Sequence, residues 1–217
     1  MSDEAPSSRT TVRRGANRAL YATEEVIAIL DAGMIAHVGV QTPDGPLVLP
    51  MAYGRDETTL YLHGAAANHI LGTGAGHEIC ATVTHVDGLV MARTPFHNSM
   101  NYRSVVVRGL ATKIETKDSK LRALKIITDH IVENWDVGRE VSDIDEKKTL
   151  VLEMPLSEAS AKVRAGDPID EPEDMAGPWW AGVIPVTTTI GEPYPAADLT
   201  GTNPVPAAYS ALDGRVL

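Results

Sequence analysis

Two histidines, His63 and His69, lie six positions apart in the stretch LYLHGAAANHIL at residues 60–71. A neutral imidazole can ligate a metal or transfer a proton near neutral pH. If a helix begins near Ala66, its free N–H groups could hold a phosphate, the small side chains would admit it, and Asn68 would add a donor. The same sequence is also consistent with an ordinary surface helix whose His69 lies in solvent. The spacing of the two histidines alone favours this second interpretation. A gap of six does not place both imidazoles on one helix face, so a zinc site is not predicted.

A second group of polar side chains lies in HNSMNYRSVVVRG, residues 97–109, where a donor-rich loop leads into an apolar strand. Tyr102, Arg103 and Ser104 offer hydroxyl and guanidinium groups at consecutive positions. A guanidinium can grip a phosphate through two parallel hydrogen bonds, and it can equally pair with one of the 29 acidic residues. The sequence leaves both roles of Arg103 open.

Two adjacent tryptophans, Trp179 and Trp180, stand in a chain that is only 5% aromatic. They could cover a planar ring or bury a loop, and the sequence favours burial. The motifs of several enzyme classes are missing: no G-x-G-x-x-G links a strand to a helix, and neither a P-loop nor a G-x-S-x-G elbow occurs. Of the other histidines, His97 lies beside the donor-rich loop, whereas the rest stand alone and give no pattern of their own, namely His37, His77, His85 and His130.

Composition narrows the classes of protein further. A net charge of −10 without a Lys/Arg run argues against nucleic acid as a partner. No apolar run approaches the roughly 20 residues of a membrane helix, and the N-terminus lacks the apolar stretch of a signal peptide, so we expect a cytoplasmic protein that does not enter membranes. Cys80 is the single cysteine, which excludes an intrachain disulfide.

Apolar periodicity predicts a mainly β chain with a few helices. A helix is expected from Thr23, which can cap it, to Gly33, and another at 118–134. Strands are predicted at 34–40, 47–53, 58–63, 78–86, 88–93, 102–115 and 149–157. Asp87 and Gly88 are expected to form a hairpin turn between two of them. Because such turns are too short for crossover helices, we expect at least six mostly antiparallel strands in a small barrel with helical additions.

The chain is predicted to divide into three parts. Residues 1–20 are polar and form an N-terminal arm, and residues 21–165 form the barrel domain. Residues 166–217 contain eight of the fourteen prolines and form a C-terminal extension. The extension is too aromatic around the tryptophans to be a free tail, so we expect it to pack on the barrel or on a partner subunit.

Six segments, taken in order, resemble the pyridoxamine 5'-phosphate oxidase-like flavin-binding proteins, in particular the branch with the nitroimidazole-resistance proteins. The segments are DGPLVLPMAYG, LYLHGAAANHIL, CATVTHVDGLVMAR, NSMNYRSVVVRG, SAKVRAGDPIDEPEDM and PWWAGVIP, and the resemblance extends from Arg18 to Ile190. It implies a six-stranded antiparallel split β-barrel that forms a homodimer, with FMN sites at the subunit interface.

The resemblance also implies positions for the cofactor-binding residues. They are Pro50, Met51, Ala52 and Tyr53 along the isoalloxazine, His63, Gly64, Asn68 and His69 at the phosphate, Val83 and Thr84 beside the ring, Tyr102, Arg103 and Ser104 on a later strand, and Trp179 and Trp180 closing the pocket. The chain lacks the Arg/Lys set with which the oxidases hold the phosphate, and it lacks their C-terminal arginine motif. Oxidation of pyridoxamine phosphate is therefore not expected.

The leading hypothesis is an FMN-binding oxidoreductase that reduces a small planar organic acceptor such as a nitroaromatic compound. His63 or His69 would then supply a proton or contact the substrate. Since the strong phosphate-binding cations are missing, a haem-binding split-barrel enzyme with His63 or His69 as axial ligand is the alternative. A non-catalytic cofactor-binding protein is the third possibility, and no metal other than haem iron is expected.

Overall fold

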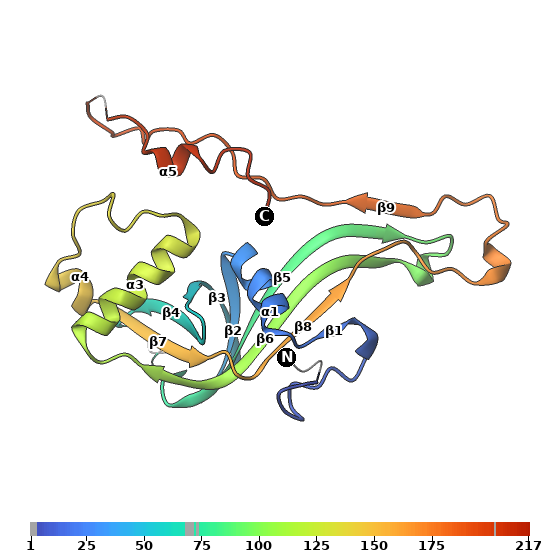
Figure 1. The fold of residues 1–217 in the computed structure, drawn as a ribbon, viewed down its shortest axis with the longest axis horizontal. Coiled ribbons are helices and arrows are strands. Elements are labelled where there is room, and N and C mark those ends of the chain that lie inside the picture. The colour runs from blue at the N-terminus through green and yellow to red at the C-terminus, as the bar shows by residue number, and fades with distance from the viewer. Residues whose placement is uncertain (1–3, 68–71, 73, 202) are drawn as a thin grey trace. The chain divides into compact units, whose positions relative to one another are not determined.

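The structure is a computed structural model that describes residues 4–67, 72, 74–201 and 203–217. Figure 1 shows its helices and strands, and the chain divides into two units. Unit 1 consists of Met1–Gly33, Val83–Val106 and Ala159–Thr188, and unit 2 consists of Met34–Thr82, Val107–Glu158 and Thr189–Leu217. Two long strands, β5 (His77–Met91) and β6 (Ser99–Lys113), contribute to both units.

Six antiparallel strands form the barrel. They are β2 (Ile35–Thr42), β3 (Gly45–Arg55), β4 (Thr59–Ala65), β7 (Thr149–Pro155), β5 and β6. Hydrogen bonding runs in the order β6-β7-β4-β3-β2-β5, and a further pairing of β5 with β6 closes the ring. The predicted mainly β fold with a six-stranded split barrel is confirmed.

The burial pattern of β2 explains its place in the barrel wall. Ala36, Val38 and Val40 are at most 4% exposed, whereas Ile35 and His37 are exposed. Successive side chains of a strand point to opposite faces, so the apolar residues at every second position fill the barrel interior. The intervening positions form the outward face of the strand.

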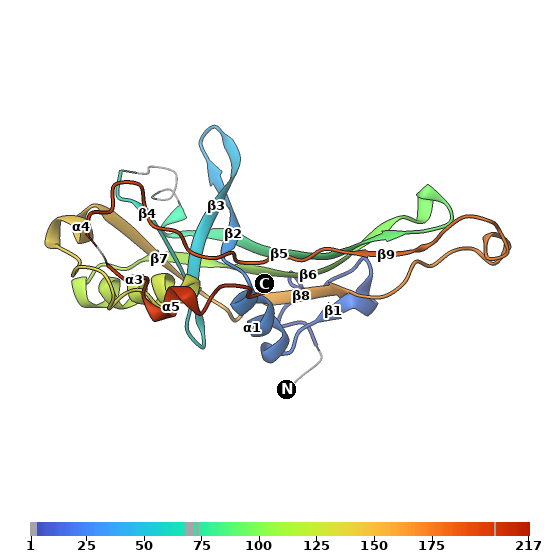
Figure 2. The ribbon, with the colours of Figure 1, turned by 90° about the horizontal axis from the view of Figure 1, so that it is seen from above.

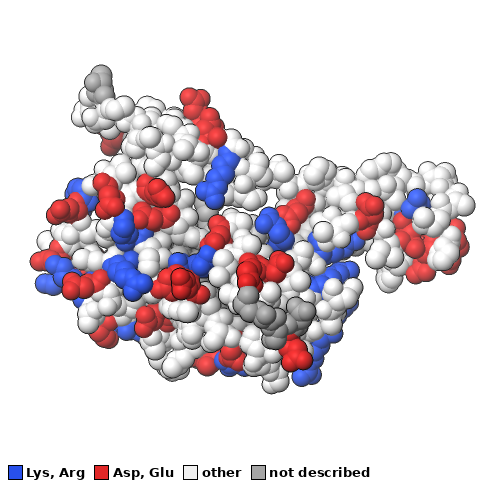
Figure 3. All heavy atoms as spheres, viewed as in Figure 1, with Lys and Arg blue, Asp and Glu red and all other residues white. Residues whose placement is uncertain are grey.

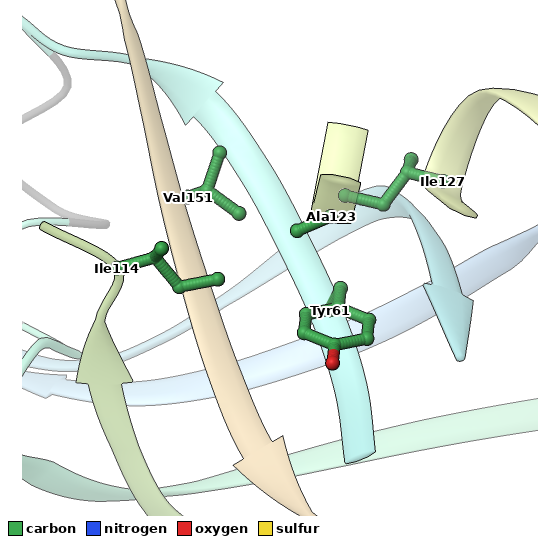
Figure 4. Close-up of a cluster of buried hydrophobic side chains, with 5 residues drawn as sticks. All are labelled: Tyr61, Ile114, Ala123, Ile127 and Val151. Atoms are coloured by element: carbon green, nitrogen blue, oxygen red, sulfur yellow. The ribbon is translucent and has the colours of Figure 1, made fainter. Parts of the chain in front are cut away.

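Helix α3 (Lys117–Ile131) covers β3 and β4 within unit 2. Its N-terminus is capped by Thr116, whose side chain accepts a hydrogen bond from the Ser119 N–H. The helix lies directly on Gly54, because a Cβ there would stand 2.6 Å from the Cα of Ile127. Apolar side chains from the helix and the strands beneath it form a buried cluster (Figure 4), namely Tyr61, Ile114, Ala123, Ile127 and Val151.

Unit 1 is built around the extended β5–β6 hairpin. Its other strands pair at the margins. Strand β1 pairs with β8. Strand β9 pairs with the Gly88–Met91 part of β5, and Figure 2 shows the two strands running beside each other. Its remaining elements are η1 (Ala16–Arg18), β1 (Ala19–Leu20), α1 (Thr23–Ala32), η2 (Pro95–His97), β8 (Ala159–Arg164), η3 (Pro172–Asp174) and β9 (Gly182–Pro185).

The predicted hairpin turn at Asp87 and Gly88 is wrong, because β5 runs through both residues as one strand. Gly88 is needed for a different reason. A Cβ at this position would lie 2.9 Å from Cγ1 of Val183, so the glycine lets β9 approach β5 closely. The Asp87 carbonyl in turn accepts a hydrogen bond from the Val186 N–H at 3.1 Å.

The predicted helices are present with small changes at their ends. Helix α1 ends before Gly33, as expected, but Thr23 is its first residue rather than its cap, and the capping position is held by Ala22 without a side-chain hydrogen bond. The helix expected at 118–134 is α3, which ends earlier, at Ile131. Among the described residues, no helix combines the length and the apolar character that crossing a membrane would require.

Residues 189–217 form a loop in unit 2 whose two ends are joined. Thr189 and Val216 form a β-bridge. The Ile190 N–H donates to the Arg215 carbonyl at 3.0 Å, and the Gly214 N–H donates to the Ile190 carbonyl at 2.9 Å. Two short helices complete the unit, α4 (Asp143–Lys147) and, inside the loop, α5 (Ala207–Ser210).

Candidate functional site

The predicted cofactor-binding residues of β3 divide between the two faces of the strand. Met51 is 9% exposed and Tyr53 is fully buried, with the Tyr53 ring centroid 4.7 Å from that of His130. Pro50 is exposed and Ala52 is half-buried, and alternation places both on the opposite face. A ligand on that face would therefore meet the side chains of Pro50 and Ala52, but only the backbone of the other two.

The neighbouring strands extend this surface within unit 2. His37 of β2 is paired with Pro50 on one side and with Thr82 of β5 on the other, and Ile35 is paired with Ala52. We call these five residues the outer face of unit 2. Pro50, Ala52 and Thr82 are small side chains, and a planar ring can lie along such a strand surface. The sequence did not single out His37, and the alternation of β2 was the signal that could have found it.

Strand β5 shows the same division at the next two predicted positions. Val83 is 2% exposed, so its side chain contributes to the interior. Thr84 is exposed and follows the alternation of Thr82. Of this predicted pair, only Thr84 presents its side chain outward.

His63 lies near the end of β4, opposite Val151 of β7. Its Nδ1 is buried and has no hydrogen-bond partner in the part of the chain that the structure describes. Burial lowers the pKa of this imidazole below its ordinary value, so the ring stays neutral at neutral pH. A neutral imidazole with an unpartnered nitrogen fits an iron ligand, and it also fits a group that carries a proton to a substrate.

The stretch after His63 differs from the predicted helix start. Strand β4 continues through Gly64 to Ala65, and the Ala66 N–H donates to the Lys148 carbonyl at 2.7 Å. That N–H is therefore not free to hold a phosphate. The predicted site residues Asn68 and His69 lie outside the described residues.

Arg103 of β6 is engaged with a carboxylate in unit 1. Its Nε lies 3.0 Å from Oδ2 of Asp87 and its Nη2 lies 2.8 Å from Oδ1, so the Nε–Nη2 edge of the guanidinium donates to one carboxylate. These hydrogen bonds raise the pKa of Arg103. Arg103 can grip a phosphate through this Nε–Nη2 edge only if it leaves Asp87. The other two residues predicted there differ: Ser104 donates its hydroxyl to the Lys162 carbonyl at 3.3 Å, and Tyr102 is half-buried.

The two tryptophans are exposed in the single chain, although the sequence favoured burial. Trp179 is 58% exposed and Trp180 is 65% exposed. Each indole lies against a glycine, since a Cβ at Gly177 would meet the Trp179 ring at 2.3 Å and a Cβ at Gly182 would meet the Trp180 ring at 2.9 Å. The glycines therefore let both rings lie close to the backbone, and more than half of each tryptophan stays exposed.

The segment that carries the tryptophans is anchored to the β5–β6 hairpin of unit 1. Asp170, whose side chain is 1% exposed, accepts hydrogen bonds from the Arg93 N–H at 2.7 Å and from its guanidinium at 2.9 Å. Arg164 reaches the same hairpin through a hydrogen bond to Oδ1 of Asn101. The first part of the C-terminal extension thus packs on strands of its own chain.

Residues 22–163 match the sequence profile of the family described as pyridoxamine 5'-phosphate oxidase. The chain belongs to this family. The pyridoxamine 5'-phosphate oxidase family profile ends within β8, before the C-terminal extension. No curated protein matches the chain.

Two solved structures resemble this family member over nearly its whole length. The flavocytochrome Anf3 from Azotobacter vinelandii is 36% identical, with 98% of this chain and 100% of that one covered and a TM-score of 0.93. The FAD and haem binding protein from Mycobacterium smegmatis is 30% identical, with coverages of 91% and 98% and a TM-score of 0.86. Both similarities therefore extend into the C-terminal extension that the family profile leaves out.

A third structure shares only the fold. The protein from Bacteroides thetaiotaomicron named for 5-nitroimidazole antibiotic resistance is 24% identical, with coverages of 67% and 86% and a TM-score of 0.58. The structural neighbours of this family member therefore include a flavocytochrome, an FAD and haem binding protein, and the protein named for 5-nitroimidazole antibiotic resistance.

Proposed function

We propose that this protein is an oxidoreductase that binds a flavin nucleotide and a haem. Two structures support the proposal, since a flavocytochrome and an FAD and haem binding protein resemble the chain at 36% and 30% identity over more than nine tenths of its length. Within the chain, the observation that carries it is the buried, unpartnered Nδ1 of His63. A polar atom buried without a partner costs free energy, and a ligand that engages the imidazole would offset that cost.

The proposed roles follow from where each side chain lies. His63 is the candidate iron ligand, because its imidazole is held neutral by burial. The outer face of unit 2 supports the flavin ring, with Pro50 and Ala52 beneath it. His37 can donate or accept a hydrogen bond at the edge of that face. A bound flavin would supply hydride and single-electron transfer, and a bound haem would supply single-electron transfer.

We further propose which flavin the protein binds and which class of acceptor it reduces. The chain lacks the cationic set that holds the FMN phosphate in the oxidases, so we propose FAD or FMN and leave the choice to a binding measurement. Reduction of a small planar acceptor such as a nitroaromatic compound remains the proposed reaction of the flavin. The exposed indoles of Trp179 and Trp180 offer flat faces on which a planar ligand of unit 1 could stack.

We also propose that the protein works as a homodimer. Unit 1 exposes many large apolar side chains, and such surfaces usually contact a partner. They are Leu89, Phe96, Met100, Ile169, Met175, Trp179, Trp180 and Ile184. Phe96 is 89% exposed and Ile169 is 74% exposed, which is high for apolar side chains in water. A second copy of the chain would cover this surface, and sedimentation velocity measures the resulting mass.

Absorption spectroscopy tests the cofactor proposal directly. The purified protein is titrated with hemin, FMN and FAD, and we expect both a Soret band and the visible flavin bands. His63→Ala should lose or shift the Soret band while the flavin bands remain. His77→Ala is the matched control, because His77 is an exposed histidine at the start of β5 in the same unit. Unchanged haem stoichiometry and an unchanged Soret band in His63→Ala would remove His63 as the ligand, and a protein that binds neither cofactor would refute the proposal.

A further inference from the structure

An open pocket of about 490 Å³ lies in unit 1 between the N-terminal segment and the end of β8. Asn17 and Arg18 form one wall. Arg164 and the loop that follows it, residues 165–169, form the other. Its volume is within the range of small-molecule sites and exceeds that of a simple inorganic anion. None of the residues assigned above to flavin or haem lines it.

Arg164 brings a buried positive charge to this pocket. The residue is 7% exposed, and its guanidinium donates to Oδ1 of Asn101, to the Gly166 carbonyl at 3.1 Å and to the Asp167 carbonyl at 3.0 Å. All three acceptors are neutral. A buried guanidinium without a carboxylate is costly, since neutral acceptors satisfy its hydrogen bonds but do not neutralise its charge.

Arg18 adds a second charge on the opposite wall. The residue is half-buried, and within the described chain its guanidinium makes neither an ion pair nor a hydrogen bond. One carboxylate, that of Asp167, also belongs to the lining, but it pairs with neither arginine within 4.0 Å. The lining therefore keeps a net positive charge.

The surroundings of the pocket are basic as well, although the whole chain has a net charge of −10. The Lys162 ammonium donates to the Arg14 carbonyl at 2.8 Å rather than to a carboxylate. Figure 3 shows blue Lys and Arg side chains gathered where β8 and the N-terminal segment lie. A local excess of cations in an acidic chain attracts anions and raises their concentration at the site.

We propose that this pocket binds the phosphate group of a nucleotide-sized ligand. Arg18 contacts the phosphate directly, and Arg164 supplies a fixed charge beneath it. Hydrogen bonds to three backbone or side-chain oxygens hold the Arg164 guanidinium in place, so little side-chain freedom is lost on binding. A doubly charged phosphate matches two guanidiniums better than a single carboxylate does.

Isothermal titration of the full-length protein with ADP, pyrophosphate and succinate tests the proposal. We expect ADP and pyrophosphate to bind, and Arg18→Gln to weaken both by about tenfold or more, the effect of losing a hydrogen bond to a charged group. Arg13→Gln is the control, because it removes the same charge from an exposed neighbour that does not line the pocket. Its effect should stay within about twofold, as expected for a screened surface charge.

Several results would overturn the proposal. Absence of ADP and pyrophosphate binding would do so. An equal loss in both variants would reduce the site to general electrostatic attraction, and succinate binding as tight as pyrophosphate binding would remove the preference for phosphate. These titrations use protein without added flavin or haem, so they can succeed even if the cofactor proposal fails.

A competition experiment distinguishes two sources of the phosphate. FAD contains an ADP moiety and FMN does not. If FAD displaces ADP from the pocket and FMN does not, the ligand is the adenylate end of the flavin. If ADP binds equally well to flavin-loaded protein, the ligand is a separate nucleotide. Both results support phosphate binding, and each assigns it to one source.

Discussion

Asp87 holds the guanidinium of Arg103, and replacing Asp87 with asparagine should release Arg103 for a flavin phosphate. The Nε–Nη2 edge of the guanidinium is occupied in this pair, at 3.0 and 2.8 Å. Binding of a phosphate through this edge must therefore break the pair first. Asp87→Asn keeps the shape of the side chain and its backbone carbonyl but removes the charge that competes with the ligand.

The size of the effect follows from the exposure of the pair. The side chains of Arg103 and Asp87 are 32% and 35% exposed, so solvent screens their attraction and the pair contributes at most about 1 kcal/mol. In Asp87→Asn the ligand no longer has to break this ion pair, so flavin affinity should rise by up to about fivefold. Arg103→Gln should lower it, because the phosphate then loses its guanidinium.

Flavin fluorescence quenching measures the dissociation constants of FMN and FAD for each variant. Asp44→Asn is the matched control, since it removes one negative charge from an exposed turn residue of unit 2. It corrects for the change in net charge, so its affinity should equal that of the unmodified protein. Equal affinities for the unmodified protein, Asp87→Asn and Arg103→Gln would show that Arg103 has a structural role and never contacts the phosphate.

Three further predictions concern stability. Gly54→Ala should lower the free energy of unfolding, measured by denaturant titration, by about 1–3 kcal/mol or more, because the alanine Cβ would meet the backbone of Ile127. Gly138→Ala is the control. It should have little effect in the same titration, because the space around Gly138 is open. Burial raises the pKa of Tyr61 to about 12, so stability should be lost as pH rises from about 10 through about 12, and Tyr61→Phe should abolish that loss in thermal melts. Burial lowers the pKa of His63, so the folded state binds fewer protons than the unfolded state and stability should fall as pH drops below 6.5; a His63→Gln melt curve with the same acid slope would contradict this.

Local patterns in the sequence predict the barrel well. The alternation in β2 and the turn before β3 fix which residues fill the interior, because one face of each strand must be buried. The same alternation shows that Met51 and Tyr53 cannot share an outward face with Pro50 and Ala52. The resemblance that singled out all four residues carries no information about the face on which each side chain lies.

Long-range pairing accounts for most of the differences from the sequence prediction. Gly88 has the local signature of a turn, but its role depends on β9, which follows it by more than ninety residues. Arg103 had many possible carboxylate partners, and nothing local identifies Asp87. The Ala66 N–H likewise donates to the carbonyl of Lys148, a residue far away in the sequence that no local pattern could identify.

The joined ends of the loop at residues 189–217 have a consequence for protein engineering. Because the bridge between Thr189 and Val216 and the hydrogen bonds of Ile190 close this loop at its base, its interior can change length without disturbing the strands. Each doubling of a flexible loop costs only about 0.6 kcal/mol in closure entropy. Residues 194–201 are all exposed, so an affinity peptide or a fluorescent domain inserted there should leave the barrel unaffected.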